Sequence, residues 1–312
     1  MSTLALAGIV RRFGRGAHVA RALDGVDLAL CAGEIVGLVG ESGCGKSTLA
    51  RIAVGLDRPD AGTVLCDGRP LFGDRGRVAR PMRQRIQLVF QEPLASFNPR
   101  RTVGGSIAMP LRALRMADGD TGAAVAALLE QVGLDPGLAR RRPHALSGGQ
   151  LQRAAIARAL APRPDFLVCD EPVASLDVSV RAQVLNLLLD QWRERGVGIL
   201  FISHDLGVVR RIADRVAVMY LGRVVEIGAG ETVWAAPAHP YTRALAAAVP
   251  AGRADRAGPG LRLGGEPPRP YAVPAGCRFH PRCPLAVDRC RREDPALRPL
   301  ASGRMAACHL AG

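Results

Sequence analysis

The stretch GESGCGKS, residues 40–47, fits the pattern G-x-x-x-x-G-K-[ST] at every fixed position. It follows the apolar run IVGLV at 35–39, which suits a buried parallel strand, and it precedes TLARIAVGL, which we expect to form a helix. Glycines let backbone N–H groups converge on phosphate, and the helix N-terminus adds the positive end of its dipole. The order strand, glycine loop, helix therefore predicts an α/β fold with a phosphate-binding loop (P-loop).

Two side chains of this loop have expected roles toward a nucleotide. Lys46 is the only lysine among 42 basic residues, and its compact ammonium suits the β- and γ-phosphates better than a broad guanidinium does. The Ser47 hydroxyl is the expected Mg²⁺ ligand. The alternative, a glycine turn with a chance lysine, is disfavoured by the flanking strand and helix. The predicted phosphate-binding residues are Gly40, Glu41, Ser42, Gly43, Cys44, Gly45, Lys46, Ser47 and Thr48.

A second apolar strand, FLVC at 166–169, ends at the acidic pair Asp170 and Glu171. An aspartate at the end of a strand can hold Mg²⁺, and a glutamate beside it can act as general base on the attacking water. Strands often end in acidic residues, so the pair by itself is weak evidence. Its position downstream of a P-loop predicts that it completes a nucleotide site.

The segment Leu146-Ser-Gly-Gly-Gln150 precedes LQRAAIARAL, which has apolar residues at helical spacing. Ser147 is therefore a predicted N-cap, and the two glycines allow backbone amides to approach an anion. A flexible loop is the alternative for these glycines taken alone. Their place between the P-loop and the Asp170-Glu171 strand resembles the nucleotide-binding subunits of ABC transporters, over about residues 3–236. The resemblance implies a RecA-like P-loop NTPase domain with an N-terminal antiparallel β subdomain and an inserted helical subdomain.

The resemblance also assigns roles to residues outside the P-loop. It implies that Phe13 stacks on adenine, that Gln91 contacts Mg²⁺ and water, and that His204 contacts the γ-phosphate. Asp177, in the segment Ser175-Leu-Asp177, is expected to contact an opposite subunit. The residues expected to bind the partner's ATP are Ser147, Gly148, Gly149 and Gln150, and those expected at Mg²⁺ are Ser47, Gln91 and Asp170.

Composition narrows the class of protein. The net charge of +14 comes from arginines spread along the whole chain, without a lysine-arginine block or a nucleic-acid-binding motif, so we expect no nucleic-acid partner. No apolar run reaches the roughly 18 residues of a membrane span. The N-terminus has its arginines after its apolar stretch, the reverse of a signal peptide. We therefore expect a cytoplasmic protein with reduced thiols.

The C-terminal part indicates a subfamily. HPYTRALAAAVP at 239–250, followed by a tail of the form C…RCP…C…CHL, resembles the ATP-binding subunits of oligopeptide, dipeptide and nickel importers. Between 250 and 270, ten of 21 residues are Gly or Pro, which predicts an irregular linker. The expected divisions are an ABC domain at 1–249 with its helical subdomain at about 92–160, the linker at 250–270, and a cysteine-bearing extension at 271–312.

The resemblance implies an ATPase that powers import of peptides through separate membrane subunits. One P-loop and one LSGGQ predict a head-to-tail dimer with a paralogous chain or a second copy. Residues 92–107 are expected to dock the membrane subunits at the cytoplasmic face of the inner membrane, with an external binding protein completing the system. Import of nickel or another small solute is the alternative. A soluble ABC ATPase acting on nucleic acid or ribosomes is a more distant one.

Four cysteines lie in the tail, Cys277, Cys283, Cys290 and Cys308, separated by five, six and seventeen residues. Reduced, clustered thiolates can bind structural zinc or an iron–sulfur cluster. These spacings contain no C-x₂₋₄-C pair of the kind that zinc sites use, and they also differ from ferredoxin spacings. Free thiols are the third alternative. The resemblance to the importers favours a [4Fe–4S] cluster held by the four cysteines. His280 and His309 could substitute as ligands, but four cysteines already suffice.

Overall fold

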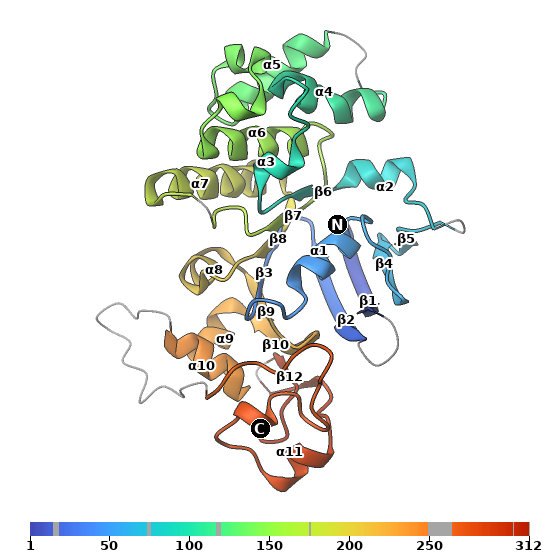
Figure 1. The fold of residues 1–312 in the computed structure, drawn as a ribbon, viewed down its shortest axis with the longest axis vertical. Helices are drawn as coiled ribbons and strands as arrows, with labels where there is room; N and C mark the ends of the chain where they lie inside the picture. Colours follow the sequence, from blue (N-terminus) through green and yellow to red (C-terminus); the bar gives the residue numbers. More distant parts are fainter. Residues whose placement is uncertain are drawn as a thin grey trace.

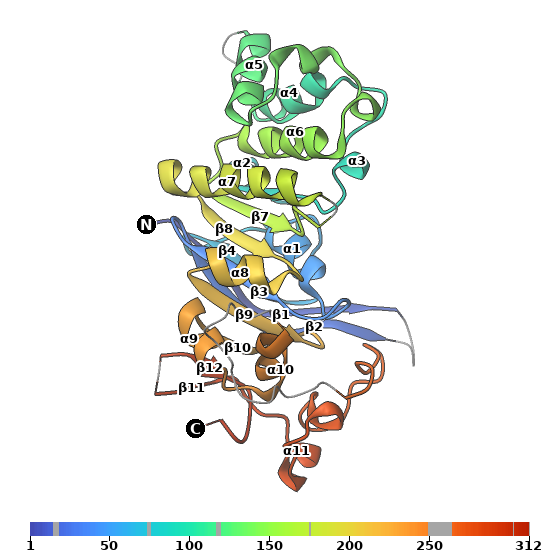
Figure 2. The same ribbon diagram turned by 90° about the vertical axis from the view of Figure 1, so that its left-hand side faces the viewer.

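Two β-sheets form the centre of the molecule, with a group of helices at one end and the C-terminal segment at the other (Figures 1 and 2). The computed structural model describes residues 1–14, 19–73, 76–116, 120–174, 176–248, 264–301 and 303–311. The smaller sheet has the order β2-β1-β4-β5, and the larger has the order β11-β12-β10-β9-β3-β8-β7-β6. The strands are β1 Thr3–Phe13, β2 Ala20–Cys31, β3 Ile35–Val39, β4 Ala61–Cys66, β5 Arg69–Pro70, β6 Ile86–Val89, β7 Phe166–Asp170, β8 Gly198–Ile202, β9 Arg215–Tyr220, β10 Arg223–Ala229, β11 Arg298–Pro299 and β12 Met305–Ala306.

The parallel strands β9, β3, β8, β7 and β6 form one side of the larger sheet, and β6 is its edge strand. Every residue of β3, β7 and β8 is buried, because both faces of the sheet are covered. Side chains alternate between two cores: Val36 and Leu38 pack into one cluster, and Ile35 and Val39 into the other. The strand expected at 35–39 is confirmed. Because the strands are parallel, their carboxyl ends meet at one edge of the sheet.

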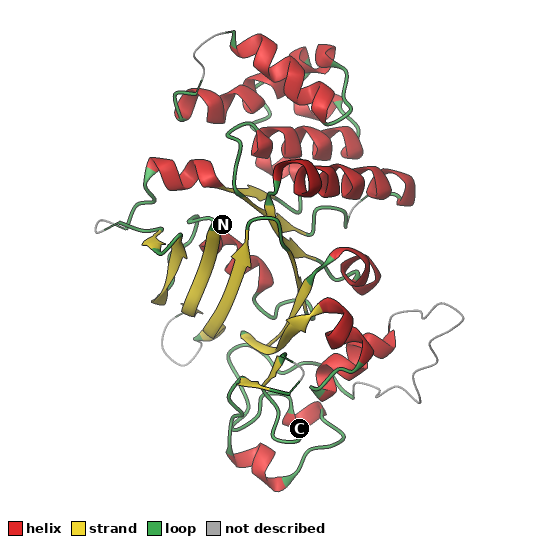
Figure 3. Cartoon of the chain, turned by 180° about the vertical axis from the view of Figure 1, so that it is seen from behind, coloured by secondary structure: helices red, strands yellow, loops and turns green. Residues whose placement is uncertain are grey.

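The smaller sheet is antiparallel. One of its faces packs into the core cluster that contains Val36 and Leu38, through Leu4, Leu6 and Ile9 of β1 among others. This is the antiparallel β subdomain expected from the sequence, and the fold class is confirmed. Seen from behind, the uppermost helices stand apart from the two sheets, whereas other helices lie against the strands (Figure 3).

Helices between β6 and β7 form the upper part of the molecule in Figure 1. Three begin at side-chain N-caps, Thr102, Asp120 and Ser147, as short polar residues favour at that position. Their apolar faces pack into the core cluster that contains Ile35 and Val39 of β3, and Ile107 and Leu129 belong to this cluster. The helices of the chain are α1 Lys46–Ala53, α2 Arg80–Arg85, α3 Pro93–Ser96, α4 Val103–Ala113, α5 Thr121–Gln131, α6 Gly148–Leu160, α7 Val178–Arg195, α8 Leu206–Ile212, α9 Gly230–Ala235, α10 Pro240–Ala248 and α11 Asp288–Arg292.

The C-terminal segment continues the larger sheet, which the sequence did not indicate. Its strand β12 pairs antiparallel with β10, Glu226 opposite Ala306, and β11 pairs with β12 at the edge. Strands of two residues are too short for any hydrophobic period to reveal. Most of the predicted linker at 250–270 lies outside the described residues. In the whole described part of the chain, no helix is long and apolar enough to cross a membrane.

Candidate nucleotide site

The P-loop joins β3 to α1 and encloses the side chain of Lys46, which is 6% exposed. Its Nζ donates to the carbonyl oxygens of Gly40, at 2.7 Å, and Glu41, at 3.0 Å. A buried ammonium requires such acceptors. Gly40 has a φ of 155°, and a Cβ there would lie 2.3 Å from the carbonyl oxygen of Met219, so no other residue fits. The loop thus holds its lysine by bonds that phosphate oxygens can replace.

Two of the predicted Mg²⁺ ligands, Ser47 and Asp170, face each other. Ser47, in the first turn of α1, places its Oγ 3.2 Å from Oδ1 of Asp170, the last residue of β7. Burial raises the pKa of the Asp170 carboxyl, an effect that the Ser47 hydrogen bond opposes and the neighbouring Glu171 charge reinforces. A cation between a hydroxyl and a buried carboxylate would offset that cost. The pair therefore fits Mg²⁺.

Three predicted residues from three strand ends meet at Glu171. Gln91, after β6, donates from Nε2 to Glu171 Oε2 at 3.1 Å, and Nδ1 of His204, after β8, lies 3.1 Å from the same oxygen. The Glu171 backbone N–H also donates to the carbonyl oxygen of Ile202, at 3.0 Å. The structure therefore brings Gln91, Glu171 and His204 together beside Asp170, because parallel strands have their carboxyl ends at one edge of the sheet.

Phe13 ends β1 and is 42% exposed, with the Arg11 guanidinium 4.8 Å from its ring centroid. It pairs across the hairpin with Ala20. The neighbouring strand β2 approaches the P-loop closely, since a Cβ on Gly45 would lie 2.3 Å from the carbonyl oxygen of Ala22. An exposed aromatic ring suits stacking on an adenine, and the Arg11 guanidinium covers part of the Phe13 ring.

The LSGGQ segment lies in the helical subdomain, apart from the P-loop (Figure 1). Ser147 is the N-cap of α6 and forms a capping box with Gln150: its Oγ accepts from the Gln150 N–H, and Gln150 Oε1 accepts from the Ser147 N–H. The predicted N-cap is confirmed. Ser147 and Gly148 are exposed, whereas Gly149 packs against Val180 at the start of α7.

Asp177 is the N-cap of α7, and its Oδ1 accepts from the Val180 N–H at 2.9 Å. The LSGGQ segment and this turn are therefore neighbours, because Val180 contacts both. Ser175, the other polar residue of the predicted contact, lies outside the described residues.

The four tail cysteines are gathered in one segment, but they do not form an evident metal site. Burial raises the pKa of Cys277 to about 11, with smaller contributions from the nearby Cys290 and Cys308. Burial likewise raises the pKa of Cys283, and Cys308 and Cys290 add to it. Within the described part of the chain, no group of three or more His, Cys, Asp or Glu side chains is arranged to hold a metal ion. The expected [4Fe–4S] cluster thus gains no support and stays a prediction.

Comparison with known proteins agrees with this geometry. Residues 23–174 match the ABC transporter family, and residues 225–290 match the C-terminal region of the oligopeptide/dipeptide transporters. A probable peptide ABC transporter ATP-binding protein of Sinorhizobium fredii is 50% identical over 94% of this chain and 83% of its own length. The chain belongs to the oligopeptide/dipeptide family of ABC transporter ATP-binding subunits. This ATP-binding subunit is therefore an ATPase.

Further relatives span the same length. The di/tripeptide transport ATP-binding protein DppF of Pseudomonas aeruginosa is 46% identical over 95% of this subunit and 91% of its own chain. Among solved structures, the dimeric ATP-binding cassette MJ0796 bound to ADP and Pi superimposes with a TM-score of 0.66 and 30% identity, covering 72% of this subunit and 98% of that chain. The ABC cassette fold and a dimeric relative are thus established for the family.

Proposed function

We propose that this subunit hydrolyses ATP to power the import of peptides through separate membrane subunits. Peptide cargo is supported by the names of its relatives, which are peptide, di/tripeptide and oligopeptide transport ATP-binding proteins at 50%, 46% and 49% identity respectively. The hydrolytic part rests on one observation above all: Gln91, Glu171 and His204 converge beside the Ser47–Asp170 pair.

The chemistry follows from those positions. Lys46 exchanges the carbonyl oxygens of Gly40 and Glu41 for the β- and γ-phosphates of ATP. Glu171 takes a proton from water as the water oxygen attacks the γ-phosphorus and the bond from phosphorus to the ADP oxygen breaks. Gln91 and His204 hold the carboxylate in place from either side. Ser47 and Asp170 would hold Mg²⁺, which when bound supplies positive charge to the phosphate oxygens.

The second half of the site comes from a partner chain. The exposed Ser147 and Gly148 are supported as ATP contacts by their position at the N-terminus of α6, thirteen residues long, where backbone N–H groups are available to an anion. Because they lie in the helical subdomain, away from this chain's own P-loop, they serve the P-loop of the opposite subunit. The partner is a paralogous ATP-binding chain or a second copy, in a head-to-tail dimer.

Docking to the membrane subunits is assigned to residues 92–107 on the helical subdomain. This proposal is supported by exposed apolar side chains in and beside the segment: Leu94 is 55% exposed, Phe90 36% and Met109 48%. Docking there places the subunit at the cytoplasmic face of the inner membrane, as a peripheral component of a system with an external binding protein.

Replacing the general base tests the hydrolytic mechanism. Glu171→Gln keeps the side chain's size and one hydrogen-bonding oxygen but cannot take the proton. ATP hydrolysis, followed as phosphate release from the assembled transporter, should fall on the order of 100-fold or more, while Mg–ATP binding to the full chain persists. Native turnover in this variant would show that Glu171 is not the base.

Cargo is tested with the assembled transporter in proteoliposomes. ATP-dependent uptake of a labelled dipeptide or oligopeptide should be lost in Glu171→Gln and retained in the Arg289→Ala control, which alters an exposed ion pair in the C-terminal segment. ATP-dependent uptake of nickel ions without peptide uptake would contradict the peptide assignment.

A further inference from the structure

Glu41, the second residue of the P-loop, is bonded on three sides. Its carbonyl oxygen accepts from Lys46, at 3.0 Å. Its backbone N–H donates to the hydroxyl of Tyr241, at 2.8 Å. Its carboxylate accepts two hydrogen bonds from Arg282, from Nη1 at 2.7 Å and from Nη2 at 2.9 Å. Glu41 therefore joins the phosphate-binding lysine to two residues far along the chain.

Both distant partners belong to the C-terminal part and are buried. Tyr241, at the start of α10, is fully buried, and Arg282, in the turn between Cys277 and Cys290, is 8% exposed. The Arg282 guanidinium also bonds to the hydroxyl of Tyr220, at 3.3 Å, and its Nε bonds to the carbonyl oxygen of Gly264, at 3.1 Å. A bidentate, charge-assisted pair with a buried arginine fixes both position and orientation. This contact is not a mobile surface ion pair.

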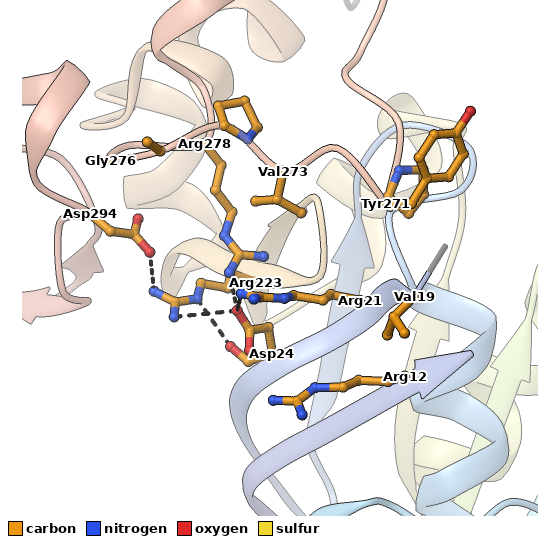
Figure 4. Close-up of a pocket in the computed structure, with 13 residues that line it drawn as sticks. Arg12, Val19, Arg21, Asp24, Arg223, Tyr271, Val273, Gly276, Arg278 and Asp294 are labelled. Atoms are coloured by element: carbon orange, nitrogen blue, oxygen red, sulfur yellow. Dashed lines mark hydrogen bonds and ion pairs between the residues drawn. The ribbon is translucent and has the colours of Figure 1, made fainter. Parts of the chain in front are cut away.

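A second attachment holds the same segment on the smaller sheet (Figure 4). Arg278, four residues before Arg282, forms an ion pair with Asp24 of β2 and a hydrogen bond with the carbonyl oxygen of Leu221. Arg223 of β10 reaches across to Asp294 of the segment, at 2.6 Å. The four charged side chains of these two ion pairs line a cavity of about 530 Å³, and none of the predicted nucleotide-binding residues lines it. The segment that carries Arg282 is thus attached to the body of the protein by Arg278 and by Asp294, independently of its contact with the P-loop.

A glycine-rich loop gains from such support. Gly40, Gly43 and Gly45 have φ values of 155°, 78° and 110°, which are conformations that glycine adopts freely, so the loop has few constraints of its own. Every loop residue that must be ordered when ATP binds lowers the affinity. Fixing Glu41 between Gly40 and Gly43 supplies part of that order in advance.

We propose that Arg282 and Tyr241 are positioning residues for the P-loop, through which the C-terminal segment sets the affinity for ATP. The inference rests on the proposed ATP site. Each loss of a bond to Glu41 weakens ATP binding while the groups expected to contact phosphate, the P-loop backbone N–H groups and the Lys46 ammonium, are all retained.

The test measures the Kd of Mg–ATP for the full chain by calorimetric titration. Arg282→Ala and Glu41→Gln should each raise the Kd about tenfold, equivalent to about 1.4 kcal/mol. The double variant should also be weakened about tenfold rather than a hundredfold, because both changes remove the same interaction. Tyr241→Phe keeps the buried ring and removes the hydroxyl, so a rise of about threefold is expected. Arg289→Ala, an exposed arginine of the same segment, should bind as the native chain does.

Folding is separated from positioning by measuring the thermal midpoint of each variant. Glu41→Gln is the informative change here, since Glu41 is half-buried and its replacement creates no cavity. Independent, multiplying losses in the double variant would overturn the inference, as would native affinity in Arg282→Ala and Glu41→Gln while Lys46→Ala loses binding. Native affinity in Lys46→Ala would instead overturn the ATP site, and the inference with it.

Discussion

At the scale of single residues, the backbone conformation of Glu171 sets the direction of its carboxylate. It has a left-handed φ of 48°, which costs a residue other than glycine on the order of 1–3 kcal/mol. Its N–H bond to Ile202 and its contacts with Gln91 and His204 hold it there. An ordinary extended φ would continue β7 and direct the carboxylate elsewhere. The strained turn is what places the proposed base beside Asp170.

His239 provides a pH-dependent prediction. Its ring is buried and accepts from the Tyr241 N–H at Nδ1, at 3.0 Å, and burial lowers its pKa to about 3. Above about pH 6.5 the imidazole is neutral in both folded and unfolded chains. Between about pH 6.5 and 3 only the unfolded chain binds the proton, so this residue lowers the free energy of unfolding by about 1.4 kcal/mol per pH unit as pH falls.

The matched variant is His239→Asn, which retains an acceptor but does not titrate. We expect chemical unfolding at a series of pH values to show that, below pH 6.5, the free energy of unfolding falls less steeply for the variant. The two slopes should differ by about 1.4 kcal/mol per pH unit, the effect of one proton. Equal slopes for the native chain and the variant would show that His239 does not cause the acid sensitivity.

At the scale of secondary-structure elements, the carboxyl ends of β3, β6, β7 and β8 gather the site, since each is followed at once by a predicted functional residue or loop. This is the edge where open parallel sheets bind ligands. On the opposite flank of the sheet, β10 is extended by β12 of the C-terminal segment. That added strand and the contacts of Arg278 and Arg282 anchor a segment with few strands and helices of its own.

For the cysteine segment, the sequence prediction of a [4Fe–4S] cluster can be checked directly. Protein purified under strict anaerobiosis should be brown and contain about four irons per chain. Cys290→Ala, which removes one of the four thiols, should lose the iron and lower the thermal midpoint, because a metal stabilises a segment too small to hold a core. Colourless anaerobic protein with one zinc, or without metal, would contradict the prediction.

At the scale of the whole molecule, the two halves of an ATP site lie in different parts of one chain. The P-loop lies at the sheet edge, and the LSGGQ segment lies in the helical subdomain (Figure 2). In the proposed head-to-tail dimer a complete site needs two chains, so turnover should rise with protein concentration and with addition of the partner subunit.

A substitution at Ser147 tests this arrangement. Ser147→Arg places a bulky cation where the partner's ATP would lie, so ATP hydrolysis at the partner's P-loop should be lost in the mixed dimer. The variant's own affinity for Mg–ATP, measured on the isolated chain, should stay native. Ser147→Thr, which retains the cap of α6, serves as the control. Weakened ATP binding by the isolated Ser147→Arg chain would place LSGGQ at its own P-loop instead.

Sequence by itself determined the elements whose signal is local. The strand–loop–helix that starts at Ile35, the N-cap at Ser147 and the acidic strand end at Asp170 each depend on neighbouring residues, so period and motif suffice to predict them. Only the end of that helix differs, at Ala53 and not at residue 56. Roles for Gln91 and His204 came only from the family resemblance, and they meet Glu171 because parallel strands bring their carboxyl ends together.

Tertiary structure alone decided how the C-terminal segment attaches. The partners Arg282 and Glu41 are 241 positions apart, and Arg278 and Asp24 are 254 apart. The chain has so many arginines that the sequence does not show which acidic residue each one contacts, and a strand of two residues is too short to show a hydrophobic period. Contacts of this kind exist only once the sheet has placed both chain segments side by side, so their energy depends on the fold and not on any local pattern.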